Sequence, residues 1–367
     1  MLGAPQDSPF VGTTAGLVCA HHHLYSSLAR GMPPPPRSPS NFNEILEQLW
    51  WRLDSALDLE MIYWSAKRGA LEALEAGTTC IIDHHESPNA IEGSLDVIAQ
   101  ACREVGVRVS CAYGVSDRHE TTGPVPINPQ PSASKRPPKM TEAAKRGLAE
   151  NVRYLTAGGR GYVGVHAAFT CADETLDTVA GTAADLGVGV HIHVAEGPAD
   201  ADAGARLEKL ARADWLLVHC VYLDRELPGT IAHNPRSNMN NAVGYAKPAE
   251  RPNRVVLGTD GIGADMLDEF RVAYARLRES DVTASPETPW SWLQNAYTLF
   301  PDAQHDSVTW SYAPMEPWNL AFTTGLHPKS VTVDDREIVS NGVATGVDRD
   351  EILAKSAEQA HRLFAHL

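Results

Sequence analysis

Positive charge is scarce in this chain, because 46 acidic residues outnumber 31 basic ones and leave a net charge of −15. A nucleic-acid surface needs Lys and Arg to displace phosphate counterions, so this balance argues against DNA or RNA as a partner. Long apolar runs are also missing, since no stretch reaches the roughly 18 apolar residues that a membrane-spanning helix needs. The N-terminal segment MLGAPQDSPF lacks the basic and apolar regions of a signal peptide. We therefore expect a cytoplasmic protein that binds neither nucleic acid nor membrane.

Cysteine pairs of the CxxC type are absent as well. The six cysteines are widely spaced and mostly lie inside apolar runs, where a thiol behaves as a small hydrophobic side chain: Cys19, Cys80, Cys102, Cys111, Cys171 and Cys220. We expect all six to be reduced and buried.

Short apolar runs rich in Val, Ile and Thr alternate with helical patterns from residue 16 onward, which is typical of βα units around a parallel sheet. Eight such runs are predicted strands: 16–20, 78–83, 107–113, 161–166, 187–193, 215–219, 229–233 and 254–259. The clearest helical patterns are at 60–76, 91–105, 141–157, 173–186 and 265–279. The length of 367 residues allows one large barrel or two ordinary domains. Eight strands favour an α/β fold, a closed (β/α)8 TIM-type barrel.

The C-terminal part of the chain has a different pattern. Residues 330–343 are predicted to form two short strands, and residues 348–367 a terminal amphipathic helix. We therefore divide the chain into an N-terminal stub (1–15), a barrel (16–325) and a reduced β appendage with a terminal helix (326–367).

Two features interrupt the regular alternation of strands and helices. Pro-rich stretches at 33–36 and 121–138 are predicted surface loops, and the first follows a pair of histidines so closely that we expect it over the active site. Only 13 residues separate His219 from His233. Any helix between these two strands has one or two turns.

The segment GLVCAHHHLYSSLARG contains two histidines that could supply part of a metal site. Side chains alternate along a strand, so His21 and His23 project from one face while His22 points the other way. Two imidazoles on one face can share a metal ion. A lone HxH is weak evidence in a chain with 15 histidines, because solvated or hydrogen-bonded histidines are common.

Three later segments place a His or an acid just where an apolar run stops. In HIHVAE, Glu196 lies three residues beyond His193, within reach of whatever His193 holds. A carboxylate beside a metal-bound water can carry protons between that water and a leaving group. Asp260 ends VVLGTD, where a buried carboxylate is costly unless it is paired or metal-bound, and His219 follows WLLV. The alternatives are a solvated Glu196 and an ordinary core histidine at 219.

Together these residues resemble the amidohydrolase superfamily, in its mononuclear branch of deaminases and chlorohydrolases. HxH follows the first strand, His-x-x-Glu the fifth, His the sixth and Asp the eighth. The resemblance is narrower still to the SsnA-type aminohydrolases, and its motifs are CAHHHLYSSLARG, LWWRLDSALD, IIDHHESP, HAAFT, HIHVAE, HNPRSNMNNAVGY and LGTDGIGADM.

This resemblance implies one divalent ion, usually zinc and sometimes iron, held by His21, His23, His193 and Asp260. Three imidazoles and one carboxylate suit either metal. Glu196 would shuttle protons to a ring nitrogen and the departing amine. His219 would orient the attacking water, and Asp260 would accept that water's proton. A homo-oligomer, such as a dimer, is also expected from the family.

Further candidates are predicted to contact a small heterocyclic substrate. They come from IIDHHESP, GVHAAFT and HNPRSNMNN, and are His84, His85, His166, Arg236, Asn238 and Asn241. A structural role is as plausible for the first two, and the last cluster can equally shape the loop after the seventh strand.

The predicted function is metal-dependent deamination of a small nitrogen heterocycle or cyclic amidine with release of ammonia. Hydrolysis of another ring bond, as in a chlorohydrolase or cyclic amidase, keeps the same site. A degraded, non-catalytic barrel that serves as a binding protein is the third possibility. It arises because relatives begin with part of a small β-sandwich, whereas only 15 residues precede the first strand here. Strands 330–343 are therefore expected to lack partners and expose an edge.

Overall fold

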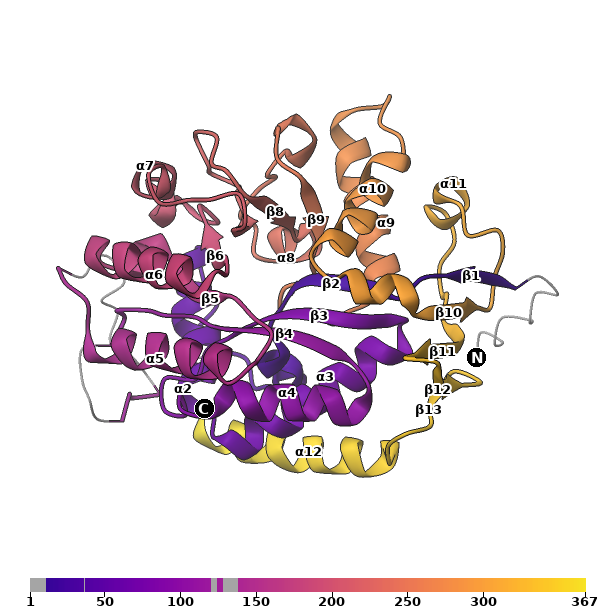
Figure 1. Ribbon diagram of the computed structural model, residues 1–367, viewed down its shortest axis with the longest axis horizontal. Helices are drawn as coiled ribbons and strands as arrows, with labels where there is room; N and C mark the ends of the chain where they lie inside the picture. The colour runs from indigo at the N-terminus through magenta and orange to yellow at the C-terminus, as the bar shows by residue number, and fades with distance from the viewer. Residues whose placement is uncertain (1–10, 36, 120–123, 128–137) are drawn as a thin grey trace.

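The structure is a computed structural model that describes residues 11–35, 37–119, 124–127 and 138–367 (Figure 1). All eight predicted barrel strands form, with ends shifted by a few residues. They are β2 (Leu17–His22), β3 (Thr78–His85), β4 (Arg108–Tyr113), β5 (Val163–Ala167), β6 (Val190–Val194), β7 (Leu216–His219), β8 (Thr230–His233) and β9 (Val255–Leu257). Most of the predicted loop at 121–138, and residue 36 of the first Pro-rich stretch, lie outside the described residues.

The eight strands run parallel in two sheets, in the orders β2-β3-β4 and β5-β6-β7-β8-β9. Isolated parallel bridges join the sheets at both edges. Cys111 and Val115 bridge to Gly161 and Val165, and a single bridge between His22 and Asp260 joins β2 to the end of β9. The strands therefore form the predicted (β/α)8 ring.

The edge between β2 and β9 is tightly packed because Gly258 has no side chain. A Cβ atom at this position would lie 2.4 Å from Oδ1 of Asn234 and 2.8 Å from the backbone nitrogen of His21. Real Cβ atoms do not approach other atoms so closely, so glycine allows the first and last barrel strands to meet.

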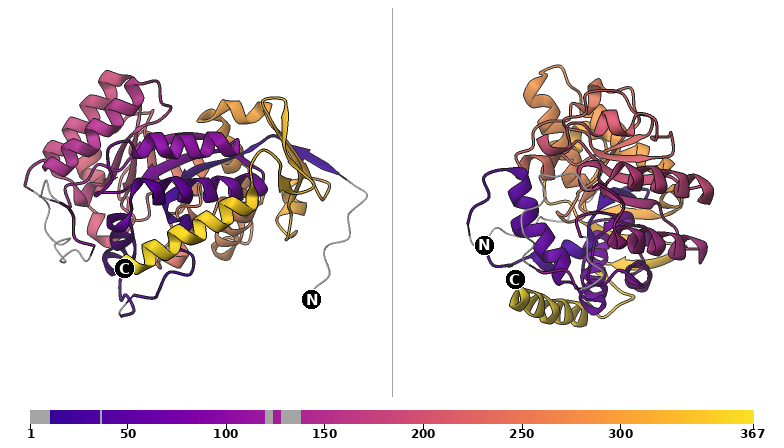
Figure 2. Two further views of the ribbon diagram at one scale, coloured as in Figure 1. Left: turned by 90° about the horizontal axis from the view of Figure 1, so that it is seen from below. Right: turned by 90° about the vertical axis from the view of Figure 1, so that its left-hand side faces the viewer.

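Helices cover the outside of the ring (Figures 1 and 2). The chain contains α1 (Phe42–Ile45), a π-helical turn (Leu46–Trp50), α2 (Trp51–Ala56), α3 (Leu59–Glu75), α4 (Ser94–Val105), α5 (Glu142–Thr156), α6 (Asp173–Leu186), α7 (Ala203–Leu207), α8 (Pro235–Asn240), α9 (Met266–Ser280), α10 (Glu287–Asn295), α11 (Pro317–Leu320) and α12 (Arg349–His366). The five predicted barrel helices and the terminal helix are present.

The link between β7 and β8 differs from the prediction. We expected a helix of one or two turns there at most, but residues 220–229, all of which are described, contain none. The following crossover has only the short helix α8. The outer layer is therefore thinnest around β7 and β8.

The expectation that the C-terminal strands lack partners is wrong. β11 (Pro328–Val333) pairs with β12 (Arg336–Ser340) and also with β10 (Ser307–Trp310). β10 in turn pairs with β1 (Gly12–Thr14) from the N-terminal segment, and β13 (Val343–Ala344) completes a five-stranded antiparallel sheet. The pairing of β1 with β10 is not apparent in the sequence, because these two short strands lie almost 300 residues apart.

This sheet is fixed to the end of the barrel opposite the strand carboxyl ends. The Trp310 side chain of β10 is buried and lies over Gly77, which follows α3 with φ of 82°. A Cβ atom at Gly77 would lie 2.6 Å from the Trp310 ring. Glycine thus ends the helix, as predicted, and leaves room for the indole.

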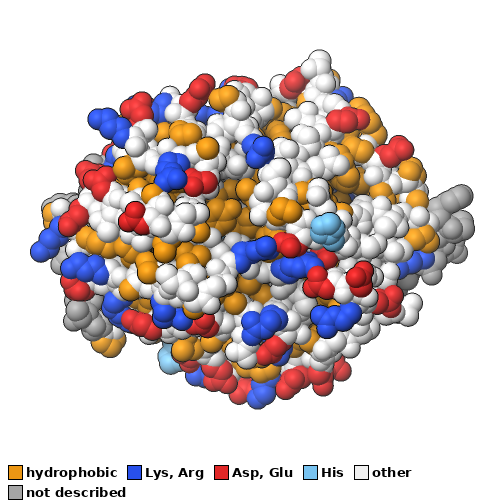
Figure 3. Space-filling model, viewed as in Figure 1, with side chains coloured by type: hydrophobic (Ala, Val, Ile, Leu, Met, Phe, Trp, Pro, Cys, Tyr) orange, Lys and Arg blue, Asp and Glu red, His pale blue; other side chains and the backbone are white. Residues whose placement is uncertain are grey.

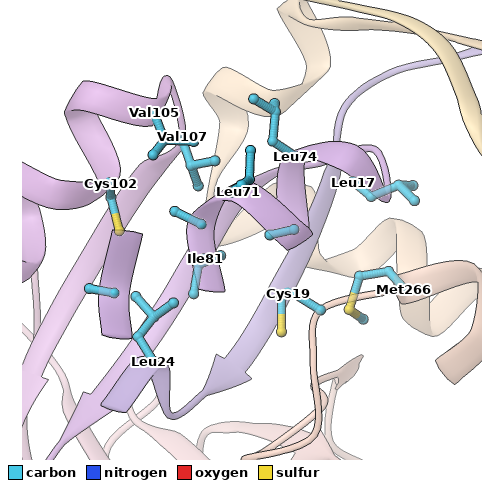
Figure 4. Packing of buried hydrophobic residues seen from close by; sticks show 14 of the residues in the cluster. Leu17, Cys19, Leu24, Leu71, Leu74, Ile81, Cys102, Val105, Val107 and Met266 are labelled. Atoms are coloured by element: carbon cyan, nitrogen blue, oxygen red, sulfur yellow. The ribbon is translucent and has the colours of Figure 1, made fainter. Parts of the chain in front are cut away.

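The largest core cluster fills the space between the first strands and their helices. Leu71 and Leu74 of α3 pack toward Ile81 of β3 and Leu17 of β2, with Met266 of α9 beside them (Figure 4). The terminal helix α12 lies along α3, where Ser356 donates a hydrogen bond to the backbone oxygen of Trp64 (Figure 2).

The surface agrees with the composition. Acidic and basic side chains are interspersed on the face shown in Figure 3, with apolar atoms between them. All six cysteines are buried and unpaired, as predicted. Among the described residues, no helix is both long and apolar enough to cross a membrane.

Candidate active site

The carboxyl ends of three strands bring the predicted metal-site residues together. His21 and His23 come from β2, His193 from β6, and Asp260 from the turn after β9. The ligand atoms of His21, His23 and Asp260 lie within 4.8 Å of one another, and so do those of His21, His193 and His219. Nε2 of His23 is 3.2 Å from Oδ1 of Asp260 and 3.3 Å from Nε2 of His193.

Backbone carbonyl groups orient two of these imidazoles. Nδ1 of His23 donates to the backbone oxygen of His84 at 2.6 Å, and Nδ1 of His193 donates to that of His166, also at 2.6 Å. When such a ring is neutral with its proton on Nδ1, its Nε2 carries a lone pair directed into the cluster. Without a metal ion, Nε2 of His23 faces Asp260 instead, and although burial opposes it, this contact raises the pKa of His23. Metal-binding histidines typically have this arrangement, in which the outer nitrogen donates to a carbonyl or carboxylate.

The donor set fits a divalent cation. Nε2 of His21 is buried and has no hydrogen-bond partner among the described residues, which is costly unless something else binds it. Burial lowers the pKa of His21 and of His193 well below the ordinary value, so both rings are neutral. Burial opposes ionisation of Asp260, but the hydrogen bond and charge of His23 outweigh it and lower the pKa of that carboxyl group. Neutral imidazoles and an ionised carboxylate are the forms that bind a metal.

The predicted catalytic residues lie beside this cluster. Nε2 of His219 is 3.3 Å from Oε2 of Glu196 and 3.7 Å from Oδ2 of Asp260. Burial, followed by the negative charge of Asp260, raises the pKa of Glu196 well above its ordinary value. A carboxyl group that keeps its proton near neutral pH can serve as a general acid.

Backbone strain is concentrated at the same place. Three non-glycine residues of the site have left-handed φ values: Ala195 at 49°, His219 at 68° and Asp260 at 55°. Such conformations cost on the order of 1–3 kcal/mol each and persist where the surrounding structure requires them. Here they turn the chain at the strand ends, so that the side chains of His219 and Asp260 face Glu196.

A cavity opens next to the cluster, and its walls are largely aromatic. His23, His193, Glu196 and Asp260 line one end. The apolar lining comes mainly from the segment after the first Pro-rich stretch, and includes Phe42, Leu46, Trp50, Trp51 and Phe169. We expected the Pro-rich loop itself over the active site. The residues that line the cavity come instead from the segment directly after that loop.

Another part of the cavity wall, called the far end below, is a buried ionic group that the sequence analysis missed. Asp54 of α2 and Glu86 after β3 line the wall, and one guanidinium nitrogen of Arg118 contacts both carboxylates, with Asp54 at 3.0 Å. The Arg118 guanidinium also lies over the Trp51 ring, 4.7 Å from its centroid. Asp54 and Glu86 occur in two of the motifs that carry the family resemblance, LWWRLDSALD and IIDHHESP, which was the available signal.

The predicted substrate contacts are divided by the structure into two groups. His166 and Asn241 line the cavity. The other four, His84, His85, Arg236 and Asn238, do not line the cavity and contact other residues of the chain. His85 contacts Ser87 at 2.9 Å, and Arg236 forms an ion pair with Glu269 at 2.8 Å.

His84 and Asn238 complete this second group. His84 is fully buried behind the metal-site histidines, with Nε2 4.0 Å from Oε1 of Glu86. Oδ1 of Asn238 lies 2.7 Å from Nδ1 of His219. Because these residues contact side chains of the site and not the cavity, their positions agree with a structural role.

The fold and the site together define a hydrolase barrel whose strand ends carry a donor set that fits a divalent metal ion. The chain belongs to the amidohydrolase family, whose model matches residues 13–302. This membership confirms the superfamily and the barrel that the strand-end motifs predicted.

Among characterised relatives, the chain is 28% identical over 398 residues to a 5'-deoxyadenosine deaminase of Methanopyrus kandleri, covering 95% of this chain and 86% of the relative. It is 31% identical over 300 residues to a 5-methylthioadenosine/S-adenosylhomocysteine deaminase of Moorella thermoacetica, covering 74% of this chain and 63% of that relative. These relatives confirm the predicted enzyme class, a hydrolase that acts on carbon–nitrogen bonds.

Solved structures share the fold. A zinc-bound adenosine deaminase from Xanthomonas campestris superposes with a TM-score of 0.75 at 20% identity, covering 96% of this chain and 86% of that one. A zinc complex of atrazine chlorohydrolase from Arthrobacter aurescens gives 0.76 at 21% identity, covering 95% and 88%.

Proposed function

We propose that the protein deaminates an aminated nitrogen heterocycle by hydrolysis and releases ammonia. The observation that carries this proposal is the cluster of Glu196, His219 and Asp260, whose reactive atoms lie together beside three more histidines. The deaminase relatives support ammonia as the leaving group. The non-catalytic alternative is set aside, because the chain is similar to enzymes over nearly its whole length.

A single divalent ion, zinc rather than iron, is proposed at His21, His23, His193 and Asp260. When bound, such an ion lowers the pKa of water and so supplies a nucleophile near neutral pH. The zinc-bound fold neighbours support this choice of metal.

The protein's own side chains account for the proton transfers. Asp260 accepts a proton from the attacking water, which His219 orients, while the water oxygen forms a bond to the amidine carbon of the substrate. Glu196 donates its proton to the adjacent ring nitrogen. Asp260 then gives its proton to the exocyclic amine, whose bond to carbon breaks so that ammonia leaves. The hydroxyl proton of the intermediate returns to Glu196 as the carbonyl group forms, which restores both side chains.

The cavity supports a flat aromatic ring as the substrate. Trp50, Trp51 and Phe169 provide apolar faces, and ring stacking on such side chains is favourable beyond simple area burial. Purine-like, pyrimidine-like and triazine-like rings share this shape. The names of the relatives make 5'-deoxyadenosine and related adenine nucleosides the first compounds to assay.

The proposal extends to the whole protein. We propose a cytoplasmic enzyme without nucleic-acid or membrane partners that forms a homo-oligomer, as is expected in the family. We change the domain division proposed from the sequence at two places, because residues 12–14 and 307–310 pair with each other and belong to the C-terminal sheet.

The test is an ammonia-release screen over aminated purines, pyrimidines, triazines and adenine nucleosides. Glu196→Gln, which retains the shape of the side chain without its acidity, is the matched control. Ammonia released by the wild type and not by the variant supports the proposal. Chloride released from a chlorinated ring without ammonia from any amine would favour the chlorohydrolase alternative.

A further inference from the structure

The short helix α8 brings polar side chains against the proposed proton-handling residues. Oγ of Ser237 donates to Oδ2 of Asp260 at 2.6 Å. One residue later, Oδ1 of Asn238 lies 2.7 Å from Nδ1 of His219. Both Ser237 and Asn238 are buried, with 3% and 1% exposure. Consecutive residues of one helix therefore contact groups that come from two different strands.

The end of the helix reaches the third residue. The Asn241 side chain lines the cavity with Glu196, and its Nδ2 is 3.4 Å from Oγ of Ser237. The helix has its own anchor at the other end, where Arg236 forms an ion pair with the fully buried Glu269 of α9 at 2.8 Å. The helix is thus fixed to the barrel independently of any ligand.

The contact from Asn238 favours a proton on Nδ1 of His219, because it is the shorter of two amide contacts to that nitrogen: Oδ1 of Asn238 lies at 2.7 Å and Nδ2 of Asn234 at 3.5 Å. A carbonyl oxygen only accepts hydrogen bonds, so Oδ1 of Asn238 requires a proton on Nδ1. In a neutral imidazole the other nitrogen, Nε2, is then a lone-pair acceptor. Nε2 is buried, has no hydrogen-bond partner among the described residues, and lies between Glu196 and Asp260. This is the tautomer that can accept a hydrogen bond from a water molecule.

We propose that Asn238 is a positioning residue, which keeps His219 protonated at Nδ1 so that Nε2 accepts from the attacking water. The inference rests on the proposed function, and it replaces the prediction that Asn238 contacts the substrate. Ser237 orients Asp260 in the same way, since its hydroxyl group occupies one carboxylate oxygen. Helix α8 thereby aligns residues from β7 and from the turn after β9.

The kinetic test compares Asn238→Leu, which has a similar size but no acceptor, with Met239→Gln. Met239 is an exposed neighbour on the same helix, with 46% exposure, and serves as the matched control. We expect kcat to fall about 10- to 100-fold in Asn238→Leu, as for other residues that orient active-site groups, while KM and the zinc content stay at wild-type values. A rise in KM at unchanged kcat would instead make Asn238 a substrate contact and overturn the proposal.

The tautomer is measured directly by NMR of the zinc-loaded wild type with 15N-labelled histidine. The His219 signals are identified by their loss in His219→Gln. We expect the proton on Nδ1 in the wild type and a change in this pattern in Asn238→Leu. A proton on Nε2 alone in the wild type would refute the inference even if Asn238→Leu fails to fold. Because this readout needs no substrate, it is independent of whether the ammonia screen succeeds.

Discussion

The two ends of the active-site cavity satisfy their polar groups in different ways. At the near end, behind the lining residues His23 and His193, His21 and His219 each have a buried Nε2 without a hydrogen-bond partner in the described chain. At the far end, Asp54 and Glu86 are both contacted by one guanidinium nitrogen of Arg118, while its other terminal nitrogen, Nη1, is buried without a partner among the described residues. The near end therefore leaves imidazole nitrogens open to a ligand, whereas the carboxyl groups of the far end are paired within the chain.

This difference suggests that the near end serves the reaction and the far end serves the stability of the fold. Unpartnered buried nitrogens cost free energy, and proteins retain them where a bound group repays the cost. A buried ion pair with a stacked aromatic ring fixes three segments of the chain to one another instead. Mutations at the near end should thus affect activity more than stability, and mutations at the far end should do the reverse.

The largest effect is expected from loss of the metal. His23→Asn removes one proposed ligand, so we expect the zinc content to fall from about one ion per chain to a small fraction, with kcat at background. Plasma mass spectrometry measures the content. His85→Asn is the control, because His85 contacts Ser87 and lies outside the donor cluster. Equal zinc content in wild type and His23→Asn would contradict the ligand assignment.

Next in size is the loss of the proton donor. Glu196→Gln should lower kcat about a thousandfold, because general acid–base catalysis typically contributes that much. The zinc content and the free energy of unfolding should remain near wild type, since Glu196 is not a proposed ligand. If Glu196→Gln turns over at the wild-type rate, the proton route is assigned to the wrong residue.

At the far end, Arg118→Met should destabilise the fold. Because Glu86 holds a proton near neutral pH, the charge that Arg118→Met leaves uncompensated is that of Asp54. A buried charge without its partner costs about 3–5 kcal/mol in the free energy of unfolding, which is measured with urea. Arg225→Met, which removes an exposed arginine paired with Asp224, should leave it nearly unchanged. A stability loss in both variants alike would show that the far-end contacts have no special role.

The smallest effect is a pH dependence of stability. Burial raises the pKa of Glu86 from the ordinary 4.5 to about 8, and the charge of Arg118 partly opposes this. Between these two values the folded protein holds a proton that the unfolded chain has released, so unfolding becomes easier as the pH rises through this range. Glu86→Gln should flatten this part of the curve of unfolding free energy against pH. An unchanged slope would mean that Glu86 is already ionised in the folded protein.

The near end was predictable because its information is local in the sequence. A histidine or acid directly after an apolar run identifies a strand end, and parallel strands in a barrel bring their ends together. His21, His23 and Asp260 needed no knowledge of loops. The left-handed backbone at His219 was not predictable, because only the packed structure requires it.

The far end depends on loop conformation, and the sequence analysis missed it for that reason. Asp54, Glu86 and Arg118 come from a helix and two loops, whose relative positions follow from no periodic pattern. The β1–β10 pairing escaped for a similar reason, since a three-residue strand has too little alternation to be recognised. The ion pair of Arg236 with the buried Glu269 on the next helix was not anticipated either, and it agrees with the alternative that this cluster shapes the loop after the seventh strand.

The single bridge between His22 and Asp260 gives the barrel a seam, and the proposed metal ligands lie on both sides of it. During synthesis, the histidines of β2 precede Asp260 by more than two hundred residues. The site is therefore complete only when the last barrel strand has joined the first. An ion held by the proposed ligands would link these two strands, so that only a fully closed barrel would bind it tightly.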